Sequence, residues 1–155
     1  MITNQELTLL LVEDSVEDYT AMQRIITKID TKIVLHRTES AEEALDFLLH
    51  KGAYSASNGQ SLRVPALIFL DLNLPGMDGR ELLRQLKKDE QLKLIPIIVM
   101  TTSSNPRDVQ ECYRFGANSY QIKSVNYKKF SESILQLFLY CRSYALTTGL
   151  NSGFK

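Results

Sequence analysis

Several segments of this chain end in side chains that could do chemistry together. The acids are Glu13, Asp14 and Asp71, and the other two groups are Thr101 and Lys123. The short apolar runs before Asp71 and before the acidic pair are typical of buried strands, so these side chains should stand at the carboxyl ends of strands. Open α/β sheets bind their ligands at that edge. Acids, a hydroxyl and an amine at one edge are the groups needed to place a phosphoryl group on a carboxylate.

The acids need a cation if they are to remain ionised together. Two carboxylates about 4 Å apart repel by roughly 4 kcal/mol at an effective dielectric of 20. Mg²⁺ suits this position, because it is a hard ion that takes oxygen ligands and commonly bridges carboxylates to a phosphate oxygen. Asp71 can then attack a phosphoryl group in line, while the metal and Lys123 neutralise its oxygens. The hydroxyl of Thr101 and the amide of Thr102 can bond the remaining oxygen.

Strand and helix patterns alternate five times along the chain. Apolar runs predict strands at about residues 9–12, 33–37, 67–71, 97–101 and 119–122. Apolar residues at helical spacing predict five helices. The residues that show this spacing are Met22, Ile25, Ile26 and Ile29; Ala41, Ala44, Leu45, Leu48 and Leu49; Leu82, Leu83 and Leu86; Val109, Cys112 and Tyr113; and Phe130, Ile134, Leu137, Phe138 and Cys141.

This alternation predicts an α/β fold, a doubly wound five-stranded parallel sheet with helices on both faces. In the flavodoxin-like strand order 2-1-3-4-5, the three acids and Thr101 meet, and Lys123 lies one strand further out. Helix starts are indicated by Ser40-x-x-Glu43, by Asp78-x-x-Glu81 and by Asn105 before Pro106. We expect the second helix to close at Gly52.

Size and composition restrict the class of protein. With 155 residues, 44% of them hydrophobic, we expect one domain with its core at about residues 7–142. The formal net charge is zero, which argues against nucleic acid as a direct partner. No segment has the length of a membrane span, and the first residues lack the features of a signal peptide, so we expect a cytosolic protein with no membrane partner.

Two segments fall outside the strand and helix pattern. Residues 52–63, rich in Ser, Asn and Gly, should form a long loop, and residues 147–155 a loose tail. The two cysteines, Cys112 and Cys141, have no metal-ligand spacing and are expected to be small buried groups. His36 and His50 are expected to lie away from the acidic edge in structural roles.

The chain resembles the receiver domains of two-component response regulators, over roughly residues 7–142. The residues that carry the resemblance are Glu13, Asp14, Asp71, Thr101 and Lys123. The resemblance implies a switch rather than an enzyme, which takes a phosphoryl group from a sensor histidine kinase and loses it only slowly. It implies these roles: Asp71 as phosphoacceptor; Glu13, Asp14, Asp71 and the backbone carbonyl of Asn73 as Mg²⁺ ligands; Thr101 as switch hydroxyl; Lys123 as the family's lysine; and Tyr120 as the aromatic that turns inward when the hydroxyl moves toward the phosphoryl group.

A finer resemblance is to the single-domain response regulators that partner cyanobacterial phytochrome kinases. It rests on the segments 70–82 and 100–106 and on Lys123-Ser124. Most receivers have Pro where this chain has Ser124, and their Lys-Pro bond is commonly cis. A cis bond before Ser costs roughly 3 to 4 kcal/mol, so the sequence leaves the conformation of this bond open.

Two other classes of protein remain as alternatives. A pseudo-receiver would bind partners without phosphorylation, and the intact acids, hydroxyl and amine argue against it. An enzyme on the same fold would be a flavodoxin or an aspartate-nucleophile phosphatase. A flavodoxin needs a phosphate-binding loop after the first strand, where this chain has the acidic run 13–18, and the phosphatases typically have an Asp at the position of Asn73.

Further residues are expected to set the lifetime of the acyl phosphate and to pass the signal to a partner. Asn73 and Ser103 lie two residues after the phosphoacceptor and the switch hydroxyl, and we expect them to set the lifetime of the acyl phosphate.

The fourth and fifth helices carry more apolar groups than one core-facing stripe needs, and a second apolar face indicates a partner. The excess aromatic residues are Tyr113, Tyr127, Phe138, Tyr140 and Tyr144, and the second apolar face of the last helix is formed by Leu135, Leu139 and Tyr140. We therefore expect a homodimer through the fourth helix, fifth strand and fifth helix, where this face and Tyr120 should lie.

Overall fold

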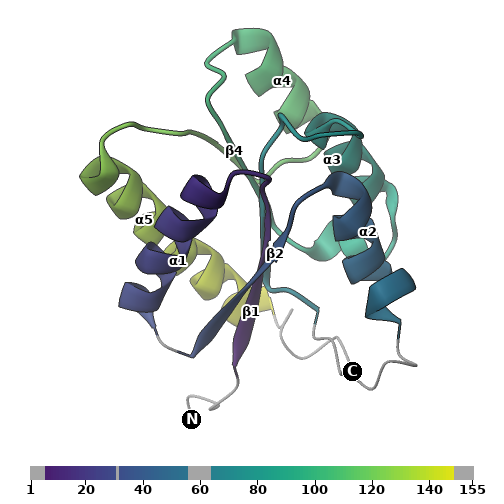
Figure 1. Ribbon diagram of the computed structural model, residues 1–155, viewed down its shortest axis with the longest axis horizontal. Helices are drawn as coiled ribbons and strands as arrows, with labels where there is room; N and C mark the ends of the chain where they lie inside the picture. Colours follow the sequence, from purple (N-terminus) through teal and green to yellow (C-terminus); the bar gives the residue numbers. More distant parts are fainter. Residues whose placement is uncertain (1–5, 31, 56–63, 149–155) are drawn as a thin grey trace.

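Five parallel strands form one sheet in the order β2-β1-β3-β4-β5. The computed structural model describes residues 6–30, 32–55 and 64–148. The strands are β1 (Leu7–Val12), β2 (Ile33–Thr38), β3 (Leu67–Leu70), β4 (Ile97–Thr101) and β5 (Ser119–Ile122). The predicted α/β fold and strand order are confirmed. All five carboxyl ends share one edge of the sheet, which is the upper edge in Figure 1.

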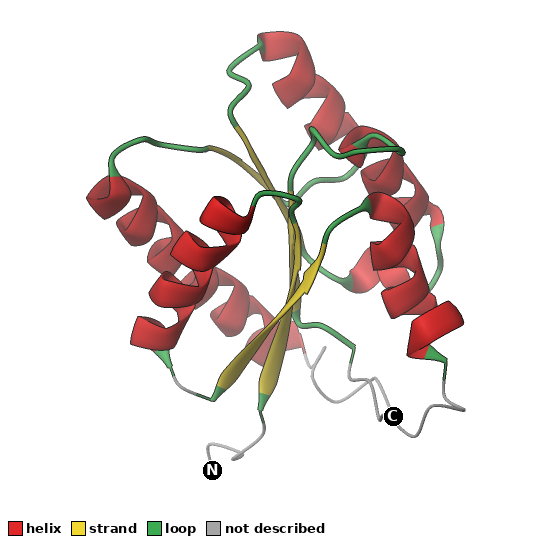
Figure 2. Ribbon diagram, viewed as in Figure 1, coloured by secondary structure: helices red, strands yellow, loops and turns green. Residues whose placement is uncertain are grey.

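Helices cover both faces of the sheet (Figure 2). They are α1 (Val16–Ile29), α2 (Ala41–Leu49), α3 (Gly79–Lys88), α4 (Pro106–Arg114) and α5 (Tyr127–Thr148), with short 3₁₀ helices η1 (Gly52–Tyr54) and η3 (Leu92–Leu94). Helices α1 and α5 lie on one side, and α2, α3 and α4 lie on the other (Figure 1). None of the helices in the described part of the chain is long and apolar enough to cross a membrane.

Two apolar clusters hold these layers together, one on each face of the sheet. Successive side chains of a strand point to opposite faces. Leu10 and Ile68 accordingly join the cluster under α2, α3 and α4, while their neighbours Leu9 and Phe69 join the cluster under α1 and α5. Strands β3 and β4 are buried along their whole length, because helices cover both of their faces.

Polar side chains fix the starts of the helices near the site. Asp78 accepts a hydrogen bond from the Arg80 backbone N–H at 2.8 Å, and Asn105 accepts one from Arg107 at 3.0 Å, with Pro106 in the first helical position. Such caps satisfy backbone donors that have no partner within the helix. The predicted starts of α3 and α4 are confirmed.

Three expectations differ from the structure. Helix α2 closes at His50, which adopts a left-handed conformation (φ 54°), because Gly52 already begins η1. The expected loop at 52–63 therefore starts with a 3₁₀ turn, and residues 56–63 lie outside the described part. Helix α5 includes Thr147 and Thr148, because the sequence has no Pro or Gly to stop it before Gly149. The rest of the expected tail, and the side chains of Cys141 and Tyr144, lie outside the description.

Candidate functional site

Asp71 stands directly after β3 and is buried. Its backbone N–H donates to the Val12 carbonyl at 3.1 Å, which joins it to the end of β1. Its carboxylate Oδ1 accepts from the Asn73 backbone N–H at 3.2 Å. Gly79, the first residue of α3, packs against the backbone here, since a Cβ at this position would meet the Asp71 carbonyl oxygen and lie 2.7 Å from the Leu72 Cα. The sequence Asp78-Gly79 therefore lets α3 begin beside Asp71.

Glu13 and Asp14 lie next to Asp71 across the β1–β3 pair, Glu13 buried and Asp14 exposed. Carboxylate oxygens of the three acids all lie within 4.8 Å of one another. Hard oxygen donors at this spacing are what Mg²⁺ requires, so the residues present fit the metal. Burial raises the pKa of Glu13 to about 7, although the hydrogen bond from Lys123 opposes this. The charged form of the buried Glu13 carboxylate is thus unfavourable, and a nearby cation stabilises it.

Arg37 of β2 holds the backbone of the acidic pair from behind. Its Nε donates to the Glu13 carbonyl at 3.0 Å, and its Nη2 donates to the Asp14 carbonyl at 2.9 Å. The guanidinium also pairs with Glu39 at 2.9 Å and lies over the ring of Tyr19, 5.2 Å from its centroid. Local sequence patterns did not predict this contact, because it joins residues more than twenty positions apart.

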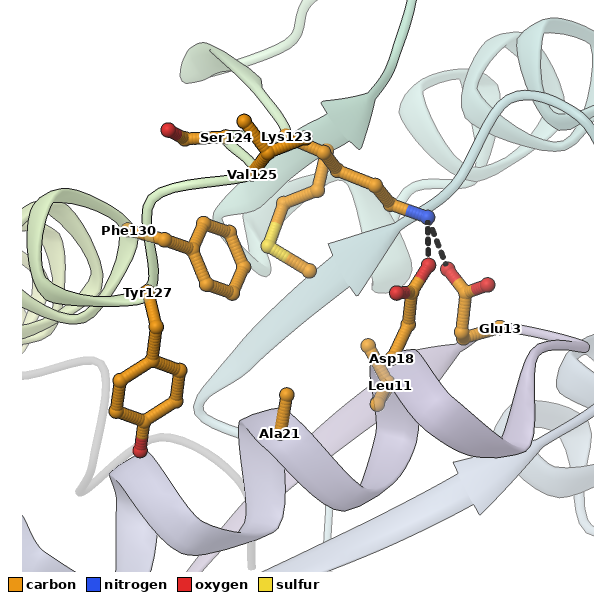
Figure 3. A pocket seen from close by; sticks show the side chains of 10 residues that line it. Leu11, Glu13, Asp18, Ala21, Lys123, Ser124, Val125, Tyr127 and Phe130 are labelled. Carbon is orange, nitrogen blue, oxygen red and sulfur yellow. Dashed lines mark hydrogen bonds and ion pairs between the residues drawn. The ribbon is translucent and has the colours of Figure 1, made fainter.

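Lys123 follows β5 and reaches across to the acids. Its amine lies 2.8 Å from Glu13, 2.7 Å from Asp18 and 3.1 Å from Asp71. Figure 3 shows the lysine extending to Asp18 and Glu13 above an apolar wall that includes Phe130. Burial alone would lower the pKa of Lys123, but the hydrogen bonds to Asp18 and Glu13 raise it above its usual value. The amine is therefore a fixed positive charge beside the Asp71 carboxylate.

Asp18 was not among the predicted site residues. It lies in the first turn of α1, four positions after Asp14, where an acid is expected simply for its effect on the helix dipole. Its contact with Lys123 depends on the packing of α1 beside α5, which a local pattern does not contain. A cavity of about 150 Å³ lies between these elements, lined on its polar side by Glu13, Asp18 and Lys123.

Thr101 ends β4 with its side chain fully buried. Its hydroxyl accepts from the Ser103 backbone N–H at 3.3 Å, which leaves the hydroxyl hydrogen available to another acceptor. Its carbonyl accepts from the Lys123 backbone N–H at 2.7 Å, so β4 and β5 together place the hydroxyl and the amine. The sequence-predicted residues Glu13, Asp14, Asp71, Thr101 and Lys123 thus all lie at this edge.

Tyr120 and Ser103 meet beside the end of β4. The Tyr120 hydroxyl donates to the Ser103 carbonyl at 2.8 Å, and its ring packs against the core. The ring thus contacts the core and the β4–α4 loop, and its inward turn on phosphorylation stays a prediction. The Ser103 hydroxyl donates to Asp108 at 2.5 Å, and Asp108 pairs with Arg80 of α3 at 2.8 Å. Neither Asp108 nor Arg80 was predicted.

The peptide bond between Lys123 and Ser124 is trans, and no described peptide bond is cis. The hydroxyl of Ser124 accepts from the Asn126 backbone N–H at 3.1 Å, which shapes the turn into α5. The question that the sequence left open at this position is therefore answered. Ser124 allows a turn that places Lys123 in the acidic group without a cis bond.

Comparison with known proteins assigns the family. The family model described as the response regulator receiver domain matches residues 9–135. The chain belongs to the response regulator receiver family. It is similar to the response regulator Rcp1 of Synechocystis, with 41% identity over 128 residues that cover 81% of this chain and 82% of Rcp1. It is also similar to the chemotaxis protein CheY-3 of Vibrio cholerae, with 26% identity over 139 residues that cover 88% of this chain and 95% of that protein.

Solved structures give the same assignment. The phosphorylated cyanobacterial phytochrome response regulator RcpA superposes with a TM-score of 0.82 at 31% identity, covering 90% of this receiver and 96% of RcpA. The Mn²⁺-bound form of Rcp1 superposes with a TM-score of 0.75 at 37% identity, covering 84% of this receiver and 91% of Rcp1. The predicted resemblance to cyanobacterial phytochrome response regulators is confirmed.

Proposed function

We propose that this receiver accepts a phosphoryl group from the phosphohistidine of a sensor histidine kinase onto Asp71. The observation that carries the proposal is the amine of Lys123, 3.1 Å from the buried Asp71 carboxylate, at the edge where Glu13 and Asp14 complete a metal-binding set. A pseudo-receiver has no need of a buried acid, a lysine and a hydroxyl at one point. RcpA in its phosphorylated form and Rcp1 with bound Mn²⁺ support the same chemistry in relatives.

The transfer needs few groups from the protein. A carboxylate oxygen of Asp71 forms a bond to phosphorus as the phosphorus–nitrogen bond of the donor breaks, and the imidazole leaves with the electron pair. Lys123 neutralises one phosphoryl oxygen, and the free hydroxyl hydrogen of Thr101 is donated to another. The remaining charge neutralisation would come from Mg²⁺, which Glu13, Asp14, Asp71 and the carbonyl of Asn73 would hold.

The receiver acts as a switch and not as an enzyme, because the phosphoryl group stays on its own side chain. Its similarity to the cyanobacterial phytochrome response regulator RcpA supports a phytochrome histidine kinase as donor, and we expect the transfer to occur in the cytoplasm. The added charge of about two units acts on the neighbouring loops, and the signal leaves through altered contacts with other proteins.

Labelling by acetyl phosphate tests the proposal. Wild-type protein with Mg²⁺ should be labelled on one residue, and removal of the metal by a chelator should stop the labelling. Asp71→Asn should abolish it, because the amide is not a nucleophile. Asp30→Asn, the same change at the far end of α1, should have no effect. Labelling that survives in Asp71→Asn, or an unlabelled wild-type protein, would overturn the assignment and favour the pseudo-receiver.

A further inference from the structure

Asp18 is an acid in this site that the metal-binding group does not include. Its carboxylate lies 2.7 Å from the amine of Lys123, while the acids whose oxygens cluster together are Glu13, Asp14 and Asp71. About half of the Asp18 side chain is exposed (47%), whereas only 14% of the lysine side chain is exposed. The lysine is therefore enclosed by acids, and one of them stands apart from the metal position.

The position of Asp18 at the start of α1 would suit a different role. In Ser15-x-x-Asp18, an acid three residues after the cap could accept a hydrogen bond from the backbone N–H of the cap itself. Here that N–H donates to Glu13 at 3.2 Å. Ser15 still caps the helix by accepting from the Asp18 backbone N–H at 3.2 Å. The cap leaves the Asp18 carboxylate free to turn toward Lys123, as Figure 3 shows.

Lys123 and a divalent cation need the same oxygens. The polar partners of the amine among the described residues are Glu13, Asp18 and Asp71, and two of these belong to the metal-binding set. The aliphatic part of the lysine borders the cavity that Met100 and Phe130 also line. When Glu13 and Asp71 hold a metal ion, Asp18 is the one of these three acids that remains free to pair with the Lys123 amine.

We propose that Asp18 is a positioning residue, which retains Lys123 beside Asp71 while Glu13 and Asp71 hold the metal. The proposal rests on the proposed function, because it assigns a task to Lys123 during phosphoryl transfer. Without Asp18, the amine binds Glu13 and Asp71 more strongly and competes with the metal. The ionised carboxylate of Asp18 thus binds the Lys123 amine from α1. The amine and the metal ion then no longer compete for the oxygens of Glu13 and Asp71.

Calorimetric titration with Mg²⁺, with no phosphoryl donor present, tests this role. Asp18→Asn keeps the shape of the side chain and removes its charge, and it should weaken Mg²⁺ binding by about five- to ten-fold. Glu17→Gln makes the same change of charge at the neighbouring exposed position of α1, and it should leave the affinity within about two-fold of wild type. Circular dichroism of each variant verifies that it is folded.

A double-mutant cycle separates the lysine-mediated effect from simple loss of charge. In a Lys123→Met background the competing amine is gone, so Asp18→Asn should no longer change the Mg²⁺ affinity. A loss that persists in that background, an equal loss in Glu17→Gln, or a wild-type protein that binds no Mg²⁺ would overturn the proposal. Wild-type protein that binds Mg²⁺ but is never labelled would overturn the proposed function alone, since the calorimetric cycle needs no phosphorylation.

Discussion

Arg37 shows how a single residue outside the acidic group can set its geometry. Its guanidinium holds the carbonyls of Glu13 and Asp14, and with them the backbone from which both carboxylates project. Residues that orient metal ligands in this way commonly contribute 10- to 100-fold to metal affinity. We expect Arg37→Gln to weaken Mg²⁺ binding by roughly ten-fold in a calorimetric titration. Glu39→Gln removes only the ion pair on the outer side of the guanidinium, and it should leave the affinity unchanged.

Asn73 and Ser103 are expected to control how long the acyl phosphate survives. Asn73 lies beside the Asp71 carboxylate through its backbone, and the Ser103 hydroxyl is engaged by Asp108. Neither side chain is a good general base, so we expect no fast hydrolysis of the phosphorylated form. Asn73→Asp should change the rate of label loss while Mg²⁺ binding stays nearly intact. A wild-type half-life of seconds at neutral pH would contradict this prediction.

At the scale of elements, local patterns predicted what local chemistry determines. Asp78, Asn105 and Pro106 indicated helix starts because caps act within one turn. The alternation of strands and helices placed Asp71 and Lys123 at one edge because parallel topology brings all carboxyl ends together. The end of α2 at His50 was missed, since a non-glycine residue rarely adopts a left-handed conformation.

The part of the site that sequence reasoning missed is held by contacts between distant elements. Asp18 meets Lys123 across α1 and the end of β5, and Arg37 meets the acidic pair from β2. Arg80 meets Asp108 from α3 to α4. Each of these charged residues has an ordinary place on its own helix or strand, and only the packing of the layers gives it a partner. A periodic pattern therefore identifies the groups at strand ends but not the residues that hold them in place.

The edge formed by β2, α2 and η1 carries a histidine whose environment should make stability depend on pH. The ring of His36 stacks on Phe47 with centroids 4.2 Å apart, and its Nε2 lies 3.3 Å from the Tyr54 hydroxyl. That hydroxyl donates to Glu43 at 2.9 Å, so Nε2 carries the hydrogen that joins the histidine to the tyrosine. As expected, His36 lies away from the acidic edge and has a structural role.

Burial lowers the pKa of His36 below its usual value, and the charge of Glu43 opposes this only in part. As pH falls below about 6.5, His36 takes up a proton in the unfolded chain before it does so in the folded protein. The stability that the neutral His36 contributes is therefore present above that pH, and it is lost as pH falls through the lower pKa of the folded state. Urea unfolding at pH 7.5 and pH 5.5 should show a larger loss of stability on acidification in wild type than in His36→Phe, which keeps the stacking without titrating. Equal losses in the two proteins would contradict the prediction.

At the scale of the whole molecule, the formal net charge is zero, so no bulk field attracts a charged partner, and we expect apolar contact to pass the signal on. The surface of α4, β5 and α5 carries exposed apolar side chains, among them Tyr113, Ile122, Leu135, Leu139 and Tyr140. The prediction of a second apolar face on α5 agrees with the exposure of Leu139 (49%) and Tyr140 (68%). Phe138, by contrast, is buried in the core beside α1.

We expect a symmetric dimer through this face, because one apolar patch on each chain is enough for a two-fold interface. Phosphorylation should strengthen it, since drawing the Thr101 hydroxyl toward the phosphoryl group acts on the loop that Tyr120 contacts through Ser103. Sedimentation with and without a phosphoryl mimic measures this at tens of micromolar protein. Leu139→Arg should yield a monomer, whereas Leu49→Arg, on an exposed position of α2, should leave the dimer intact. A monomer under both conditions would contradict the dimer, and an interface built on α1 would contradict the choice of face.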